Sequence, residues 1–206
     1  MIRRVYEQAI KASSLSDVIV ATDDQRIYDE VISFGGRVIM TSSHHLNGTE
    51  RCAEVAAAIE ADGVINIQGD EPFIHPEQID TLASLFQVPG FQIGTLVKVC
   101  DDHSLLEKPS IIKVTVTKDL QALYFSRCVI PYIRNADALT TFYKHVGIYG
   151  YKTDVLKQLV KLPPSPLELA ESLEQLRWLE NGYTIRTAIT THDSISIDVP
   201  EDLQRL

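Results

Sequence analysis

Two acidic residues follow a short apolar run, where their chemistry would suit phosphate transfer. Residues 64–67 (Val-Ile-Asn-Ile) are typical of a buried strand, and residues 68–72 (Gln-Gly-Asp-Glu-Pro) end it. Ligands of open α/β sheets bind just beyond the carboxyl ends of strands. There Asp70 would offer a hard oxygen ligand for Mg²⁺ bound to substrate phosphates. Taken alone, however, an Asp-Glu pair after a strand is more often a plain polar turn.

Gly48, Thr49 and Arg51 lie where a helix is predicted to begin. The first backbone N–H groups of a helix have no partner within it, so they suit an anion or the edge of a base. Arg51 adds a planar set of N–H donors. A capped helix with a solvent-exposed arginine is the simpler interpretation of this stretch by itself.

Polar side chains also lie on two predicted strands. Arg127 ends a hairpin strand, where its guanidinium could bind a carboxylate with two hydrogen bonds, although a surface ion pair is equally ordinary there. His145, Gly147 and Tyr149 share one face of a later strand, and the glycine leaves room for a ligand. A core histidine and a half-buried tyrosine would give the same pattern.

Asp198 follows a short predicted strand and precedes a helix that opens at Pro200. An aspartate in this place commonly caps the helix. The alternative is a second metal carboxylate that faces Asp70. That alternative requires two residues far apart in the sequence to converge on one cation.

The composition is that of an ordinary globular chain and excludes several classes of function. The chain has 206 residues, of which 45% are hydrophobic and 23% charged, and we expect one domain over 1–206. A net charge of −9 argues against nucleic-acid binding, and no apolar run is long enough to span a bilayer. We expect no signal peptide, and three widely spaced cysteines fit reduced thiols, so we expect a cytoplasmic protein.

Hydrophobic periodicity predicts the elements that position these residues. Helices are expected over about 2–12, 25–34, 49–61 and 76–86, alternating with strands over 18–22, 37–40, 64–67 and 91–99. This order predicts a mainly parallel, Rossmann-like α/β sheet with helices on both faces. Next we expect a hairpin (112–117 and 122–126), a strand at 142–152, helices at 153–160 and 165–180, and strands at 183–190 and 194–197.

Seven motifs occur along the chain in a characteristic order. They are Ala-Thr-Asp at 21–23, Gly-Thr-Glu-Arg at 48–51, Gln-Gly-Asp-Glu-Pro at 68–72, Tyr-Phe-Ser-Arg at 124–127, His-Val-Gly-Ile-Tyr-Gly-Tyr at 145–151, Ser-Pro-Leu-Glu at 165–168 with Leu-Glu-Gln-Leu-Arg at 173–177, and Asp-Val-Pro-Glu-Asp at 198–202. Together they resemble the 3-deoxy-manno-octulosonate cytidylyltransferases, or CMP-KDO synthetases, over essentially the whole chain. The resemblance implies a nucleotide-diphospho-sugar transferase-like fold and the coupling of CTP to the sugar acid KDO in lipopolysaccharide biosynthesis, with release of pyrophosphate.

The resemblance also implies cofactor, partner and site residues. Mg²⁺ is the implied cofactor, and Asp70 and Asp198 are the catalytic residues that hold it against phosphate and sugar. The implied substrate contacts are Gly48, Thr49, Arg51 and Gln68 for the nucleotide, and Arg127, His145, Tyr149, Glu174 and Gln175 for the sugar. Residues 105–140 lie outside the regular βα pattern. The family uses this region in a homodimer, so we expect a homodimer with a dimerisation or sugar-side insertion there.

The start of the sequence departs from the family pattern. Family members begin with a strand and a phosphate-binding loop of the form A-R-x-x-S-x-R-x-P-G-K, ahead of the segment that matches residues 2–12 here. We therefore expect the 206 residues, taken literally, to be inactive or nearly so. We also expect lower stability, because the middle of the sheet would be uncovered. High turnover by a preparation with the mass of residues 1–206 would contradict the first expectation.

Other classes of function fit part of the pattern. A CMP-sialic-acid-type synthetase would use the same chemistry on another sugar acid. A metal-dependent glycosyltransferase would show a D-x-D pair, whereas Asp70 and Glu71 are adjacent. An inactive fragment or a non-catalytic binding subunit is compatible with the missing loop. Pyrophosphate release that depends on CTP, Mg²⁺ and KDO discriminates among these alternatives.

Overall fold

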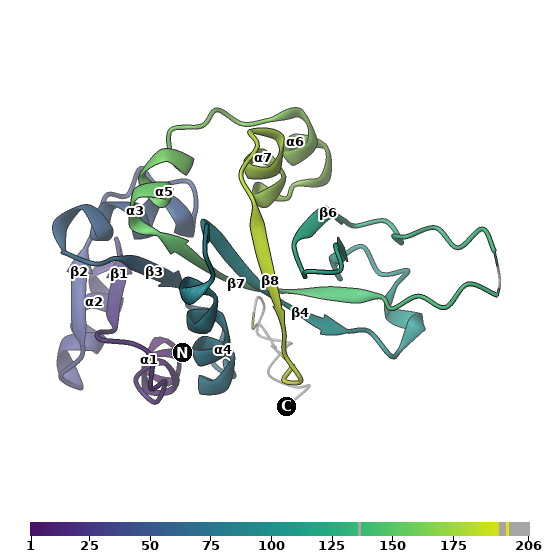
Figure 1. The fold of residues 1–206 in the computed structure, drawn as a ribbon. Coiled ribbons are helices and arrows are strands. Elements are labelled where there is room, and N and C mark those ends of the chain that lie inside the picture. Colours follow the sequence, from purple (N-terminus) through teal and green to yellow (C-terminus); the bar gives the residue numbers. More distant parts are fainter. Residues whose placement is uncertain (136, 194–196, 198–206) are drawn as a thin grey trace.

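A central sheet with helices on both sides forms the body of the protein, and an arm extends away from it (Figure 1). The computed structural model describes residues 1–135, 137–193 and 197. Within these residues, no helix has both the length and the apolar character needed to cross a membrane.

Helices and strands alternate in the first half of the chain, as the periodicity predicts. They are α1 (Ile2–Ala9), β1 (Ile19–Thr22), α2 (Gln25–Ser33), β2 (Arg37–Met40), α3 (Gly48–Ala58), β3 (Gly63–Asn66), α4 (Pro76–Ser84) and β4 (Ile93–Val99), with a 3₁₀ turn η1 (Leu85–Gln87) after α4. Side chains fix where three of the helices begin. Asp24 caps α2, Asn47 caps α3 and His75 caps α4, each by accepting a backbone N–H of the first turn.

The second half contains the arm, a long strand and three helices. Its elements are a 3₁₀ turn η2 (His103–Leu105), β5 (Lys113–Val116), β6 (Ala122–Ser126), β7 (Tyr143–Lys152), α5 (Thr153–Leu159), α6 (Pro166–Glu171), α7 (Glu174–Glu180) and β8 (Ile185–Ile189). The arm is built mostly from residues between β4 and β7 (Figure 1). The strand predicted at 194–197 lies outside the described residues except for Ile197, and the helix predicted at Pro200 lies wholly outside them.

The α/β class is confirmed, but the strand pairing is more mixed than a mainly parallel sheet. β7 runs antiparallel to β4 on one side and to β3 and β5 on the other. β8 is parallel to β4, and β6 is antiparallel to β5. β7 has ten residues and β3 and β5 four each, so one edge of β7 accommodates both short strands. Periodicity predicts that a strand exists but not which strands it pairs with.

Apolar residues fill both faces of this sheet because side chains alternate along each strand. Val97 and Tyr151 pack on one face with Trp178 of α7. Leu96 packs on the other face with Leu82 of α4. The sheet therefore lies between two helical layers.

β1 and β2 form a separate parallel pair. A cavity of about 1310 Å³ lies between β1 and β3 and is also lined by residues of α1, α3 and α4. Within the described residues, β1 pairs only with β2 and β3 pairs only with β7. Each of these two strands therefore has a strand partner on one side only.

The segment predicted as one helix over 165–180 is two helices in the structure, α6 and α7. Ser172 ends α6 in the left-handed conformation, with φ of 52°. Arg127 Nε donates to the carbonyl of Glu171 at 2.6 Å, and its Nη2 donates to the carbonyl of Ser172 at 3.2 Å. Helical periodicity could not reveal this break, because the side chain that binds these carbonyls comes from the end of β6.

Candidate active site

The start of α3 lies directly against the carboxyl end of β3. A Cβ atom at Gly48 would be 2.7 Å from Gln68 Nε2 and 3.3 Å from Asn66 Nδ2, so the close approach requires glycine. Asn47 Oδ1 accepts the backbone N–H of Glu50 at 2.9 Å and fixes the first turn. The structure thus brings Gly48 and Gln68 together, beside backbone N–H groups that suit an anion.

Arg51 joins three elements at the edge of the cavity between β1 and β3. Its Nη1 donates to Thr41 Oγ1 at 2.6 Å and to the carbonyl of Ser42 at 3.3 Å. Its Nη2 lies 3.2 Å from a carboxylate oxygen of Asp23, just after β1. The guanidinium therefore ties α3 to the ends of β1 and β2, next to the space where a nucleotide is predicted to bind.

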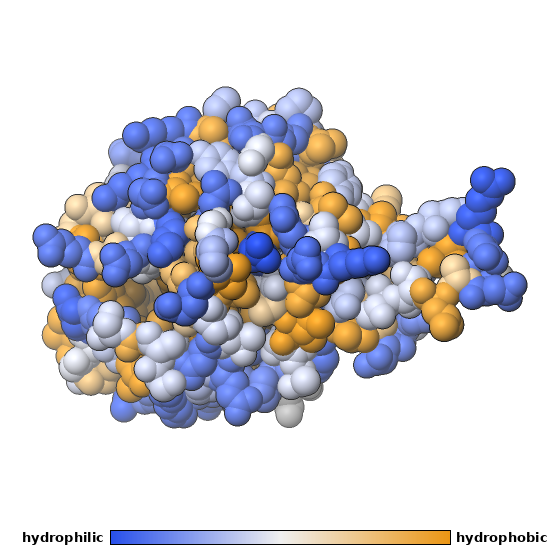
Figure 2. Space-filling view, in the orientation of Figure 1, coloured by the Kyte–Doolittle hydropathy of each residue, from blue (hydrophilic) through white to orange (hydrophobic). Residues whose placement is uncertain are grey.

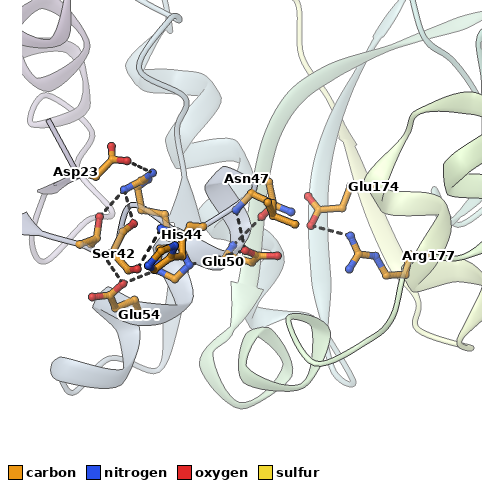
Figure 3. A network of polar contacts seen from close by, with 12 residues as sticks. Asp23, Ser42, His44, Asn47, Glu50, Glu54, Glu174 and Arg177 are labelled. Atoms are coloured by element: carbon orange, nitrogen blue, oxygen red, sulfur yellow. Dashed lines mark hydrogen bonds and ion pairs between the residues drawn. The ribbon is translucent and has the colours of Figure 1, made fainter.

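Thr49 and Glu174 connect α3 to α7. Thr49 Oγ1 donates to Glu174 Oε2 at 2.8 Å. Burial raises the pKa of the Glu174 carboxyl, although the hydrogen bond from Thr49 and the charge of Arg177, 3.7 Å away, act in the opposite direction. Figure 3 shows Glu174 between α3 and Arg177. A hydrogen bond thus joins Thr49, which is predicted to contact the nucleotide, to Glu174, which is predicted to contact the sugar.

A set of buried donors lies beside Glu174. Tyr149 is opposite Asn66 in the β3–β7 register, and its ring is 5.1 Å from that of Trp178 in a T-shaped contact. Within the described residues, Tyr149 Oη, Gln175 Nε2 and Trp178 Nε1 are buried without a hydrogen-bond partner. Buried polar atoms are seldom left unpaired, so these donors indicate a place where a polar ligand completes the structure.

His145 is held as a neutral donor. Its Nε2 is 2.9 Å from Thr95 Oγ1, while the Thr95 hydroxyl donates to the carbonyl of Ile148 at 2.8 Å. Because a hydroxyl has one proton, this network assigns the imidazole proton to Nε2. Burial lowers the pKa of His145 to about 3, so the ring is uncharged near neutral pH.

Asp70 lies beyond the carboxyl end of β3, as the sequence predicts. Its backbone carbonyl accepts the N–H of Ile197 at 2.8 Å. Asp198, the second predicted metal ligand, lies outside the described residues. The hydrogen bond places the residue before Asp198 beside Asp70.

The Arg127 guanidinium donates its hydrogen bonds to backbone carbonyls of neighbouring segments. In addition to Glu171 and Ser172, its Nη1 donates to the carbonyl of Pro109 at 2.9 Å. Its assignment to a sugar carboxylate stays a prediction. In this structure its contacts join the end of β6 to the corner between α6 and α7.

Sequence reasoning missed three residues of this region: Asp23 as the partner of Arg51, Asn66 and Trp178. A polar Asn66 inside an apolar strand was a usable signal, because a buried amide requires partners. Asp23 belongs to the Ala-Thr-Asp motif at 21–23, but no role was assigned to it from the sequence. Trp178 gave no signal, since an aromatic residue at helical spacing is usually part of a core.

Three potential metal ligands gather elsewhere, at the start of α4. His75, Glu77 and His192 each offer an atom within 4.8 Å of the others. The two imidazole rings are stacked, with centroids 3.8 Å apart and an interplanar angle of 8°. Ring nitrogens bind metals in the plane of the ring, and parallel planes direct their lone pairs side by side rather than toward one ion. We therefore assign no metal to this cluster.

Helices over both faces of a mixed sheet, with donors gathered near the end of β3, define an α/β protein with a candidate ligand site at that strand end. The family described as cytidylyltransferase matches residues 1–187, and the chain belongs to this family. It is 50% identical over 214 residues to the 3-deoxy-manno-octulosonate cytidylyltransferase of Cytophaga hutchinsonii, and 51% identical over 216 residues to that of Parabacteroides distasonis. Each match covers 100% of this chain and 85% of the relative.

Solved structures agree with this assignment. The structure of CMP:2-keto-3-deoxy-manno-octonic acid synthetase complexed with CTP has a TM-score of 0.94 and 43% sequence identity, over 99% of this chain and 84% of that chain. A glucose-1-phosphate thymidylyltransferase from Bacillus anthracis, 16% identical, has a TM-score of 0.65 over 99% of this chain and 79% of that chain. The second likeness shows the fold alone.

Proposed function

We propose that this protein couples CTP to 3-deoxy-manno-octulosonate, forming CMP-KDO and releasing pyrophosphate, for lipopolysaccharide biosynthesis. One observation carries the proposal: identity of about half to curated enzymes of that name over the whole chain. It is also supported by four motif residues that lie in one region of the fold, namely Gly48, Gln68, Tyr149 and Glu174. The three free thiols support a cytoplasmic location.

The nucleotide is proposed to bind where α3 meets β3. The N-terminus of α3 provides backbone N–H groups, and Gln68 provides a side-chain amide next to Gly48. Such an edge can bind a phosphate or the edge of a base. Arg51 is proposed to support this side of the site, since its guanidinium borders the cavity that Gly48 and Gln68 also line.

The residues present fit Mg²⁺. Asp70 provides hard carboxylate oxygens beyond a strand end, and the hydrogen bond from Ile197 places the chain just before Asp198 beside it. We propose that Asp70 and Asp198 hold the ion. When bound, the ion neutralises phosphate charge and lowers the pKa of a coordinated hydroxyl.

The sugar acid is proposed to bind between β7 and α7. It carries many hydroxyls, and the buried Tyr149 and Gln175 offer donors that lack partners within the described chain. Glu174 offers acceptor oxygens, and His145 is an uncharged ring on the same strand as Tyr149. These residues orient the sugar so that its anomeric hydroxyl faces the α-phosphate of CTP. The bond from the hydroxyl oxygen to the α-phosphorus forms as the bond to pyrophosphate breaks, and the hydroxyl proton is released to water, so catalysis consists mainly of positioning.

The decisive experiment follows pyrophosphate release with CTP, Mg²⁺ and KDO, alongside equilibrium binding of CTP and of KDO. Any release should require all three components and give a product of the mass of CMP-KDO. Replacing KDO by a sialic acid, or CTP by UTP, should abolish release. Release without a sugar acid, or specific binding of a sialic acid in place of KDO, would overturn the proposal.

We also propose that the chain forms a homodimer through residues 105–140. Tyr132 and Leu139 of the arm are 86% and 103% exposed, so the arm presents two large apolar side chains that a partner subunit could cover. Figure 2 shows apolar side chains along the arm next to a hydrophilic tip. Sedimentation of the wild type should give a dimer, and the double variant Tyr132→Ser, Leu139→Ser a monomer. A wild-type monomer at micromolar concentration would contradict this proposal.

A further inference from the structure

Lys113 is a buried lysine to which the proposed reaction assigns no role. Its side chain is 0% exposed at the start of β5. Its Nζ donates to the carbonyls of Lys108 and Ile111 at 3.2 and 2.8 Å, and also to the carbonyl of Arg127. Burial lowers the pKa of this ammonium, so keeping it inside the fold is costly. Within the part of the chain that the structure describes, the hydrogen-bond acceptors around this buried charge are all carbonyls, which calls for an explanation.

The carbonyl of Arg127 belongs to a junction of two segments. Ser126 Oγ and the backbone N–H of Arg127 donate to the two carboxylate oxygens of Glu171, at 2.7 and 2.9 Å. The Arg127 side chain donates in return to the carbonyls of Glu171 and Ser172. The end of β6 is therefore joined to the corner between α6 and α7 from both directions.

Two cations also hold the loop before β5. Lys113 binds the carbonyls of residues 108 and 111, and Arg127 binds the carbonyl of Pro109 between them. Lys113 and Ser126 are directly opposite each other in the β5–β6 register. We call Lys113, Arg127 and Glu171 the corner clamp, since together they connect this loop, β6 and the α6–α7 corner.

The corner sets where α7 begins. Glu174 and Gln175 follow Ser172 and Leu173 and form the first turn of α7. Glu174 Oε2 accepts a hydrogen bond from the Thr49 hydroxyl at 2.8 Å, and Gln175 Nε2 is one of the buried donors without a described partner. A shift of the corner would move both side chains relative to α3.

We propose that Lys113 is a positioning residue for the sugar side of the site: it acts through Arg127 and Glu171 to hold Glu174 and Gln175 opposite Thr49. This inference rests on the proposed function for the identity of the ligand. Its physical basis is preorganisation, because small displacements of binding groups reduce affinity strongly. The contact of Gly48 with Gln68 does not pass through the clamp, which reaches the nucleotide side through Thr49, so the nucleotide side should change much less than the sugar side.

The test compares Lys113→Met, which keeps the length of the side chain but removes its charge, with Lys118→Met at the exposed end of the same hairpin. Calorimetry should show KDO binding weakened about tenfold or more by Lys113→Met. CTP binding should change less than about twofold, and the control should change neither. Equal losses for both ligands, or unchanged KDO binding, would overturn the inference.

Two further measurements keep the test decisive. If Lys113→Met does not fold, Glu171→Gln weakens the same clamp and should give the same selective loss of KDO binding. If the wild type binds no KDO, the proposed function fails, and amide exchange over residues 171–176 tests the clamp independently. Amide exchange at residues 171–176 should become faster in whichever clamp variant folds, while exchange in α5 stays unchanged. Unchanged exchange at residues 171–176 would contradict the proposed role of the corner clamp.

Discussion

Asp70 is the single residue on which the proposed metal chemistry depends most directly. Asp70→Asn keeps the size of the side chain but removes the charge that would hold Mg²⁺. A bound metal contributes several kcal/mol to such a transfer, so turnover should fall by about a hundredfold or more. The measurement is the rate of pyrophosphate release at saturating CTP, KDO and Mg²⁺.

Asp62→Asn is the matched control for this prediction. Asp62 precedes β3 at its opposite end, is exposed, and lies away from the proposed site. It should retain wild-type turnover, and thermal unfolding should show that both variants fold. Activity that survives in Asp70→Asn would contradict the assignment of the metal.

Glu174 should give the folded chain a pH dependence that can be predicted in sign. Burial raises the pKa of its carboxyl above 4.5, so the folded state holds the proton more tightly than the unfolded state. Between the two pKa values the folded state binds more protons, and the free energy of unfolding therefore falls as pH rises. Above the raised pKa this contribution is constant.

Glu174→Gln cannot ionise and should remove this fall. Urea unfolding from about pH 4 to about pH 8 should show a smaller loss of stability with rising pH than in the wild type. The exposed Glu107→Gln is the control and should follow the wild type. Parallel curves for Glu174→Gln and wild type would show that the buried carboxyl is not perturbed.

At the scale of elements, the break between α6 and α7 stores strain at one residue. Ser172 has φ of 52°, a conformation that costs a residue with a side chain about 1–2 kcal/mol. Ser172→Gly should raise the free energy of unfolding by up to about 1 kcal/mol, and Ser172→Val should lower it by about 1–2 kcal/mol. Denaturant unfolding measures both changes.

Ser84→Gly is the control and should lower the free energy of unfolding, the opposite of the change expected for Ser172→Gly. Ser84 is the last residue of α4, and glycine in a helix is unfavourable by about 0.5–1 kcal/mol. A Ser172→Gly variant that is destabilised as much as Ser84→Gly would show that the left-handed conformation carries no cost.

This break also shows where prediction from sequence stops. The Ser-Pro-Leu-Glu pattern at 165–168 predicts a capping box formed by Ser165 and Glu168, and α6 begins there as expected. Its end depends on Arg127, which reaches the carbonyls of residues 171 and 172 from another strand. Local patterns predict caps and periodicity, whereas contacts between distant segments decide where a regular pattern is interrupted.

The site follows the same division. Asp70 lies beyond the predicted strand end and Gly48 at the predicted helix start, because both positions depend on short-range features of the sequence. The roles of Asp23 and Trp178 and the backbone contacts of Arg127 depend on which elements face each other. Hydrophobic periodicity does not predict the order of strands in a sheet, and in this protein the strand order determines the contacts of Asp23, Trp178 and Arg127.

At the scale of the whole molecule, the cavity between β1 and β3 separates a two-stranded pair from the larger sheet. β1 and β2 pair only with each other within the described residues, whereas β4 lies between β7 and β8. Regions with few neighbouring strands open locally more often than central strands. Amides of β1 and β2 should therefore exchange with solvent at least about tenfold faster than those of β4.

CTP should reduce this difference if the proposed nucleotide site is correct. Arg51 ties α3 to Asp23 and Thr41 at the ends of β1 and β2, so a ligand that orders α3 should also protect these strands. Hydrogen exchange with and without CTP measures the effect, and Arg51→Lys, which loses the planar set of donors, should weaken it. Protection by CTP confined to α7 would contradict both the site and this coupling.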